Sequence, residues 1–235
     1  MLKTKKAETI LEVIIAVAVL MVILAPASAL YIASIRTAAT NRNDLVAAAL
    51  AEEGIEIVRN IRDTNFIKFS DKIEDCWNTV PNHSGNDCAV NKIGNGPYRL
   101  EVNVYSTSPD YLKWTLAGVA DGAVHNALHT YVDPVSGETK YDLIETNDED
   151  YRLTLDEGDS PHTNLYYHYD PAAFPPGTPA PDPSPFYREI TISYEPLTVP
   201  PAGDDAMKVI SRVLYRTGIT VRVIERVAFL TREPS

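Results

Sequence analysis

One acidic side chain lies inside the most apolar stretch of the chain. Between Ile10 and Ile35, Glu12 is the only Asp, Glu, Lys or Arg. A charged side chain costs up to about 2.5–3.5 kcal/mol at the centre of a membrane span and less near its end. A carboxylate in this position therefore indicates a cationic partner that offsets its desolvation. The alternative is that Glu12 lies at the level of the lipid headgroups and has no function.

The histidines and the acidic clusters form no recognisable catalytic or metal-binding set. His125 and His129 are four residues apart, but the residues between them lack the Glu of the helical zinc-protease motif. The acid-rich stretches 147–150 and 156–159 lack the ligand order of an EF-hand, so solvated loops are the simpler interpretation and calcium binding the alternative. No nucleophile, base and orienting acid can be assigned. We therefore expect no enzyme activity, no cofactor and no metal site.

The two cysteines favour a disulfide. Cys76 and Cys88 are the only cysteines of the chain, and no pair of histidines lies near them to complete a zinc site. If this part of the chain is exported, an oxidising compartment favours a bond between them. Closing such a loop stabilises a fold by roughly 3 kcal/mol in the chain-entropy account.

The apolar stretch around Glu12 is long enough to span a membrane. The 26 residues from Ile10 to Ile35 rise about 39 Å as a helix, against a hydrocarbon core of about 30 Å. Lys3, Lys5 and Lys6 precede it, and the positive-inside rule then predicts a cytoplasmic N-terminus and an exported remainder. The formal net charge of −11 disfavours binding to nucleic acid.

The helical pattern continues beyond the apolar stretch. After Arg36, apolar residues recur every three or four positions, at Leu45, Ala48, Ala51, Ile55, Val58 and Ile61. This predicts a single helix from about Thr9 to about Arg62, apolar all round in its first half and amphipathic in its second. Pro26 should kink it, and Gly54 is a milder weak point. The second half is expected to pack against a globular domain.

Period-two alternation predicts a sheet in the rest of the chain. It marks five segments: Tyr98–Tyr105, Tyr151–Leu155, Phe186–Tyr194, Met207–Tyr215 and Ile219–Phe229. In the third, Ile190 and Ile192 share one face and Glu189 lies on the other. Arg216–Gly218 reads as a tight hairpin turn. Asp170–Pro185 contains seven prolines and is predicted to be neither sheet nor helix.

The residues Lys5–Val13 resemble the leader and mature start of type IV pilins and type II secretion pseudopilins. In that superfamily a basic leader ends in a small residue, usually Gly, after which prepilin peptidase cuts, and the new N-terminus is methylated. The resemblance implies a cut between Ala7 and Glu8, N-methylation of Glu8, and Glu12 at the fifth mature position. There the family's Glu pairs with the terminal amine of a neighbouring subunit. Two positions depart from the family pattern: Ala7 replaces Gly, and Glu8 replaces Phe or Met.

The end of the predicted helix is similar to a narrower group. The run Ala51–Asp63 resembles the helix end of PilV-type minor pilins and the related I-type pseudopilins, and the terminal strands resemble that subfamily's sheet. The resemblance implies a non-enzymatic filament subunit. Its partners would be other pilin or pseudopilin subunits, prepilin peptidase, an inner-membrane assembly platform and membrane lipid.

We therefore expect an α+β, pilin-like fold with a long N-terminal helix packed on a C-terminal antiparallel sheet. The predicted organisation is a leader at 1–7, a membrane or filament-core helix at 8–36, an amphipathic helix at 37–65 and an extracytoplasmic β-rich head at 66–235, with the proline-rich excursion at 170–185. The expected location is a single-pass membrane protein that enters a filament at the cell surface or in the periplasm.

Two alternatives remain open from the sequence. Ala27 and Ala29 form the small-x-small pattern of an ordinary signal-peptidase site, which would release a soluble secreted or cell-surface binding domain beginning at Leu30. Glu12 argues against this, because the apolar core of a secretory signal rarely carries an acid. The resemblance also leaves open whether the filament serves adhesion or motility, type II secretion or DNA uptake.

Overall fold

The computed structural model describes residues 5–80, 88–102, 114–118, 130–132, 134, 137, 139–141, 152–156, 165–168, 183–196, 205–218 and 220–232 of the 235-residue chain. Its helices are α1 (Lys5–Lys68), the short α2 (Ile73–Cys76) and a 3₁₀ turn, η1 (Ala89–Asn91). Its strands are β1 (Gly96–Val102), β2 (Trp114–Gly118), β3 (Thr130–Val132), β4 (Thr139–Tyr141), β5 (Arg152–Asp156), β6 (Leu165–His168), β7 (Pro183–Pro196), β8 (Asp205–Thr217) and β9 (Thr220–Leu230).

Helix α1 is one uninterrupted helix of 64 residues that contains Pro26. It extends past the predicted end at Arg62 to Lys68. The added turn has tertiary partners, because Asn65 is buried and Phe66 packs against the main core. Contacts divide the chain into two compact units, residues 1–45 and residues 46–235. The first is helical throughout its described part, and the second contains the end of α1 and every strand.

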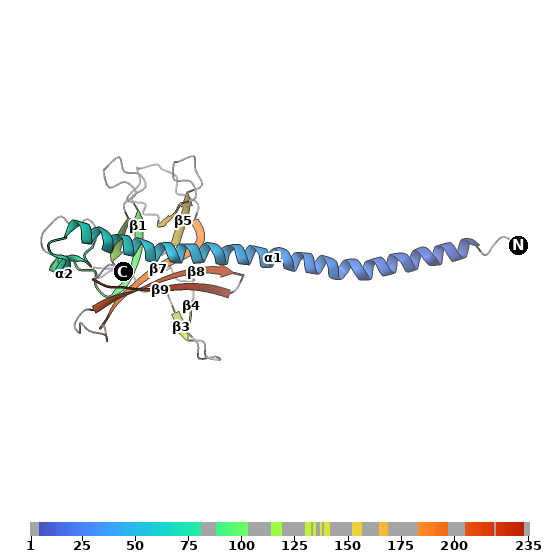
Figure 1. Ribbon diagram of the computed structural model, residues 1–235. Coiled ribbons are helices and arrows are strands. Elements are labelled where there is room, and N and C mark those ends of the chain that lie inside the picture. The colour runs from blue at the N-terminus through green and yellow to red at the C-terminus, as the bar shows by residue number, and fades with distance from the viewer. Residues whose placement is uncertain are drawn as a thin grey trace, which may run out of the picture. The chain divides into compact units, whose positions relative to one another are not determined.

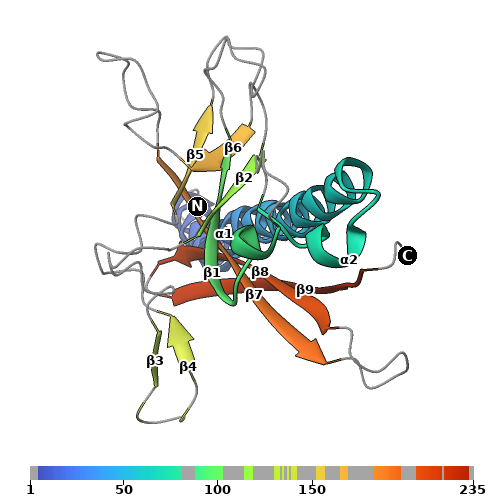
Figure 2. The ribbon, with the colours of Figure 1, turned by 90° about the vertical axis from the view of Figure 1, so that its left-hand side faces the viewer.

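The second unit is built on an antiparallel sheet of seven strands (Figures 1 and 2). β7 lies at its centre and pairs with β8 from Phe186 to Pro196. The other edge of β7 is shared, because β1 pairs with residues 190–192 and β5 pairs near its start. β2 continues the sheet beyond β1, β6 beyond β5 and β9 beyond β8, while β3 and β4 form a separate two-stranded pair. The expected α+β class with an antiparallel sheet is confirmed.

The alternating segments form strands where they fall within the described residues. Tyr98 and Leu100 are buried in β1, and Ile190 and Ile192 are fully buried in β7. β8 and β9 form the predicted hairpin, in which residues 218 and 219 separate the paired Thr217 and Thr220. A two-residue loop of this kind favours φ above zero, and Gly218 has φ of 63°.

One sequence prediction about β7 differs from the structure. The proline-rich segment was expected to exclude sheet through Pro185, but β7 begins at Pro183. Pro183 and Pro185 are exposed, and the pairing with β5 shifts register here, which is where a sheet tolerates a residue without a backbone donor. Glu189, on the face opposite Ile190, is also buried, so this face of the strand is covered as well.

The amphipathic end of α1 packs on the sheet, as predicted (Figure 1). Ile55, Val58 and Ile61 lie in one core cluster with residues of β1, β7 and β8. Nearer the start of this stretch, Ala47, Leu50 and Ala51 join Phe186, Val213 and Tyr215 in a second cluster. Burial of each large apolar side chain contributes about 1.5–3 kcal/mol, so this stripe is the principal attachment of the helix to the sheet.

Candidate functional site

The first unit carries an unusual amount of apolar surface. Within the described residues, one helix, α1, is long and apolar enough to cross a membrane. Sixteen large apolar side chains between Ile10 and Ile35 are 45–74 % exposed, and none of this apolar window is buried within the chain. This exposed apolar surface is compatible with a single membrane-spanning segment.

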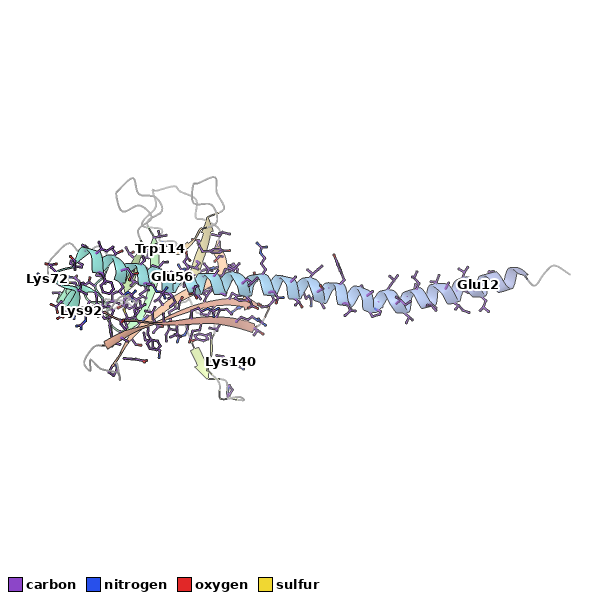
Figure 3. All side chains as sticks on the ribbon, in the orientation of Figure 1. Glu12, Glu56, Lys72, Lys92, Trp114 and Lys140 are labelled. Atoms are coloured by element: carbon purple, nitrogen blue, oxygen red, sulfur yellow. A yellow bond between two sulfur atoms is a disulfide. The ribbon has the colours of Figure 1, made fainter. Side chains whose placement is uncertain are left out.

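Glu12 lies at the beginning of this surface and its side chain is exposed (Figure 3). Its carboxylate accordingly has room for a partner from another molecule. Residues 7 and 8 belong to the helical backbone of α1, but their side chains lie outside the described part of the structure. Cleavage between Ala7 and Glu8, and methylation of Glu8, therefore stay predictions.

Two hydroxyl groups near the middle of α1 form hydrogen bonds inside the helix. Ser28 Oγ donates a hydrogen bond of 2.8 Å to the carbonyl of Ala25, and Thr40 Oγ1 donates one of 3.1 Å to the carbonyl of Arg36. Such bonds to the preceding turn pair these hydroxyl groups without a partner from outside the helix. The helix also runs without a break through Ala29, where the alternative signal-peptidase site would lie.

A buried charge holds the amphipathic end of α1 to β7. The side chain of Arg188 is 1 % exposed, and its Nη1 lies 2.7 Å from Oε2 of Glu53 on the helix. The same nitrogen donates to the carbonyl of Leu50 at 3.4 Å, and the guanidinium lies over the ring of Trp114. Burial lowers the pKa of Arg188, and the Glu53 carboxylate offsets this in part. Arg188 therefore depends on Glu53 to neutralise a guanidinium charge that water does not reach.

Gly54, next to Glu53, lies where the helix approaches the sheet closely. A Cβ at this position would lie 2.4 Å from Ser211 Oγ and 2.8 Å from Ile190 Cδ1. The sequence suggested only a weak point in the helix. The structure gives a different reason for the glycine: a larger residue fits here only if the side chains of Ser211 and Ile190 move.

An open cleft of about 420 Å³ lies beside this contact, between α1 and Trp114. Its lining residues are Glu53, Glu56, Ile57, Arg59, Asn60, Asp63 and Trp114. Each carboxylate already faces an arginine: Glu53 faces Arg188, Glu56 faces Arg59 and Asp63 faces Arg62. The cleft therefore offers no free acid–base pair.

A second polar network occupies the opposite face of the sheet. Arg212 of β8 lies 2.7 Å from Glu225 of β9 and 3.3 Å from the buried Glu189 of β7. Burial acts to lower the pKa of Arg212, but its bond to Glu225 and the proximity of Tyr141 and Glu189 raise it overall. Burial raises the pKa of the Tyr141 phenol. These charges tie three neighbouring strands together, which is a structural role.

The predicted disulfide is confirmed. Cys76 and Cys88 are bonded, with their Cα atoms 5.1 Å apart, and both pack against Phe69 just beyond the end of α1. Asn65 in the last turns of the helix donates to the carbonyls of Trp77 at 3.2 Å and Thr79 at 2.9 Å. The bond thus closes a loop that is already fastened to the helix end by hydrogen bonds.

Several sequence candidates lie outside the described residues. These are His125, His129, the acidic stretch 147–150 and residues 157–159 of the other one. Among the residues with assigned positions, no group of three or more His, Cys, Asp or Glu side chains is arranged to hold a metal ion. Comparison with known proteins gave no matching protein family, no matching curated protein and no matching solved structure.

Sequence reasoning missed the buried Arg188–Glu53 pair and the tight contact at Gly54. An arginine within an otherwise apolar strand face, between Phe186 and Ile190, was the available signal for the first. A glycine inside an alanine-rich amphipathic helix was the signal for the second, because Gly disfavours helix by about 1 kcal/mol relative to Ala and requires a compensating reason.

Proposed function

We propose that this chain is a minor pilin-class subunit, processed by prepilin peptidase and assembled through its N-terminal helix into a type IV pilus or pseudopilus. The observation that carries the proposal is the combination of Glu12 with a continuous apolar surface on α1 that no other described part of the chain buries. A lipid anchor alone needs the apolar surface but no carboxylate. A filament core needs both, because the acid sets axial register against a cationic neighbour.

In this proposal the subunit waits in the membrane and then exchanges lipid for the helices of other subunits. Glu12 pairs with the amine that cleavage creates at Glu8 of a neighbour. Pairing in a medium of low dielectric offsets the desolvation of both charges and is lost if either is absent. The partners are therefore other pilin or pseudopilin subunits, prepilin peptidase, an assembly platform and membrane lipid.

The secreted alternative fits less well with the exposure of α1. Release after Ala29 would leave Leu30, Tyr31 and Ile32 at the start of the soluble product, where they are 72, 69 and 50 % exposed. Contact of these side chains with lipid or with other subunits of a filament removes the free-energy cost of exposing them to water. A structural rather than catalytic role is proposed for the head, because the carboxylates of the cleft beside Trp114 are committed to arginines.

The proposed maturation is tested by measuring the N-terminus of the protein in cells that supply prepilin peptidase. Intact-mass and N-terminal peptide analysis should give a chain that begins at Glu8 with one added methyl group. Ala7→Leu should block the cut, because a bulky residue replaces the small one at the cleavage position. Ala29→Leu is the matched control and should change nothing. A mature chain that begins at Leu30, or unchanged processing of Ala7→Leu, would refute the proposed site.

A further inference from the structure

The apolar stretch of α1 ends at a pair of arginines. Arg36 directly follows Ile35, and Arg42 lies six residues further along the helix. They are the only Lys or Arg residues between Lys6 and Arg59. The positive charge of this part of the helix is therefore confined to the few turns that follow the apolar surface.

Both arginine side chains are exposed and have no partner among the described residues. Neither guanidinium forms an ion pair or a hydrogen bond with any side chain or backbone group in the described part of the chain. The bond between Thr40 and Arg36 uses the backbone carbonyl of the arginine and leaves its guanidinium free. Each guanidinium carries five N–H donors, so the acceptors come from water or from another molecule.

The spacing along α1 matches the layers of a bilayer. Tyr31 lies about 28 Å from Glu12 at the usual helical rise, close to the hydrocarbon thickness of about 30 Å. Arg36 and Arg42 lie about 36 and 45 Å from Glu12, against about 40–45 Å for a bilayer with its headgroups. With Glu12 at one edge of the hydrocarbon, Tyr31 thus lies at the other edge and the arginines lie among the headgroups. Tyr31 is 69 % exposed, and tyrosine is enriched at this boundary.

The direction of side chains on a helix favours contact between these arginines and the bilayer. Every Cα–Cβ bond is tilted toward the N-terminus of the helix, which at this end of the apolar stretch is the direction of the membrane. The long stem of Arg42 can therefore extend back along α1 to the level of the phosphates. Arg36 and Arg42 are separated by about 120° around the helix axis, so they reach different lipid molecules.

Acidic side chains of another subunit are the competing partners. They would account for two unpaired arginines, but not for a tyrosine at the hydrocarbon edge or for the match to bilayer dimensions. Lipid accounts for all three observations with one placement of the helix. The planar guanidinium is also suited to phosphate, which it binds through two parallel N–H donors.

We propose that Arg36 and Arg42 bind the phosphate groups of anionic lipids on the exported side of the membrane. This inference rests on the membrane-inserted state of the proposed function. The two arginines hold α1 at a fixed depth, with Glu12 at the opposite edge of the hydrocarbon. Their lipid contacts are broken when the subunit leaves the bilayer for a filament.

The test is native mass spectrometry of full-length protein in detergent micelles supplied with phosphatidylglycerol or phosphatidylcholine. Replacement of Lys3, Lys5 and Lys6 by Gln first removes lipid binding by the other cationic end of the span. In this background the dissociation constant should be about fivefold lower for phosphatidylglycerol, with a smaller difference at high salt. Arg36→Gln with Arg42→Gln should make the two lipids equal, and each single variant should keep one preferred site instead of two.

Arg59→Gln is the matched control, since it makes the same change away from the end of the apolar stretch and should keep the preference. Resistance to extraction from membranes by alkaline carbonate reports that each variant is still inserted. If the wild-type chain is not inserted, both this inference and the proposed function are overturned.

Two results would overturn the lipid site alone in a chain that remains inserted. The first is equal binding of the two lipids before Arg36 and Arg42 are replaced. The second is a preference for phosphatidylglycerol that survives the double substitution. If that double variant also enters filaments poorly, the arginines pair with acids of another subunit instead.

Discussion

Residues 10–35 and residues 46–68 belong to one helix, yet their apolar side chains differ in exposure. In the first stretch the large apolar side chains are exposed, and Glu12 is the only acid or base. In the second, Ile55, Val58 and Ile61 are buried against the sheet while charged residues lie on the other side. Backbone hydrogen bonding is the same in both, so the difference is one of side-chain pattern. The apolar stripe of the second stretch packs against the sheet of the same chain. A stretch that is apolar on all sides needs lipid or other chains to cover it.

This comparison predicts that head stability depends on the second stretch and not on the first. Both tryptophans, Trp77 and Trp114, lie in the second unit, so tryptophan fluorescence during urea unfolding reports on that unit alone. Variants of full-length protein in detergent can therefore be compared on one scale.

The largest loss is expected from Glu53→Ala, about 3–5 kcal/mol in the free energy of unfolding. The substitution leaves the fully buried guanidinium of Arg188 without its counter-ion. Adding Arg188→Met should restore much of the loss, because it removes the uncompensated charge and keeps an apolar side chain of similar length. Leu20→Ala, in the apolar stretch, is the control and should leave unfolding unchanged. A small effect of Glu53→Ala, or no recovery in the double variant, would show that the pair does not fasten the helix.

Removal of the disulfide should cost somewhat less. Cys76→Ser combined with Cys88→Ser is expected to lower the free energy of unfolding by roughly 3 kcal/mol, because the loop regains its freedom in the unfolded chain. Non-reducing electrophoresis after thiol alkylation checks that the bond is present in the wild-type protein. Two free thiols there would contradict the pairing, and equal stability with and without the bond would contradict its role.

The smallest of these effects is expected at Gly54. Gly54→Ala should lower the free energy of unfolding by about 1–3 kcal/mol, because the new Cβ meets Ser211 and Ile190. Helix propensity acts in the opposite direction by about 1 kcal/mol, so the sign itself is informative. Ala49→Gly on the exposed side is the matched control and should cost only the propensity term. Stabilisation by Gly54→Ala would mean that helix and sheet are less tightly packed than described.

The periodicity of the sequence was sufficient for the main elements. It gave a helix across both stretches, the alternating core of β1 and β7, and the hairpin of β8 and β9. These are local patterns in which each residue reports the environment of its own face. The disulfide also followed from the sequence, because only two cysteines were present.

What the sequence did not give were contacts between distant residues. Arg188 and Glu53 lie 135 positions apart in the sequence, so no local periodicity predicts their pairing. The burial of Glu189 depends on its ion pair with Arg212 and on the side chains that cover the second face of the sheet. The prediction that the residues up to Pro185 lie outside the sheet was wrong. A proline is tolerated in a strand where its backbone nitrogen is not needed as a hydrogen-bond donor, and only the pairing of the strands shows where that is. The position of β9 at the edge of the described sheet is likewise a property of strand order.

The central claim is that Glu12 acts between subunits rather than within one. Glu12→Gln keeps the size and hydrogen-bonding capacity of the side chain but removes its charge. The variant should insert, mature and fold as the wild type does, since its side chain has no role in the head. It should then enter filaments poorly, because a neighbour's terminal amine is left without its partner.

The deciding measurement is the ratio of subunit in sheared filaments to subunit in the membrane fraction. The account predicts that Glu12→Gln lowers this ratio about tenfold, equivalent to a lost interaction of about 1.4 kcal/mol, with equal amounts of mature protein in the cell. Glu56→Gln makes the same chemical change on an exposed position of the head and should leave the ratio unchanged. Incorporation of Glu12→Gln at the wild-type ratio would contradict the account and leave Glu12 as a passive acid at the membrane surface.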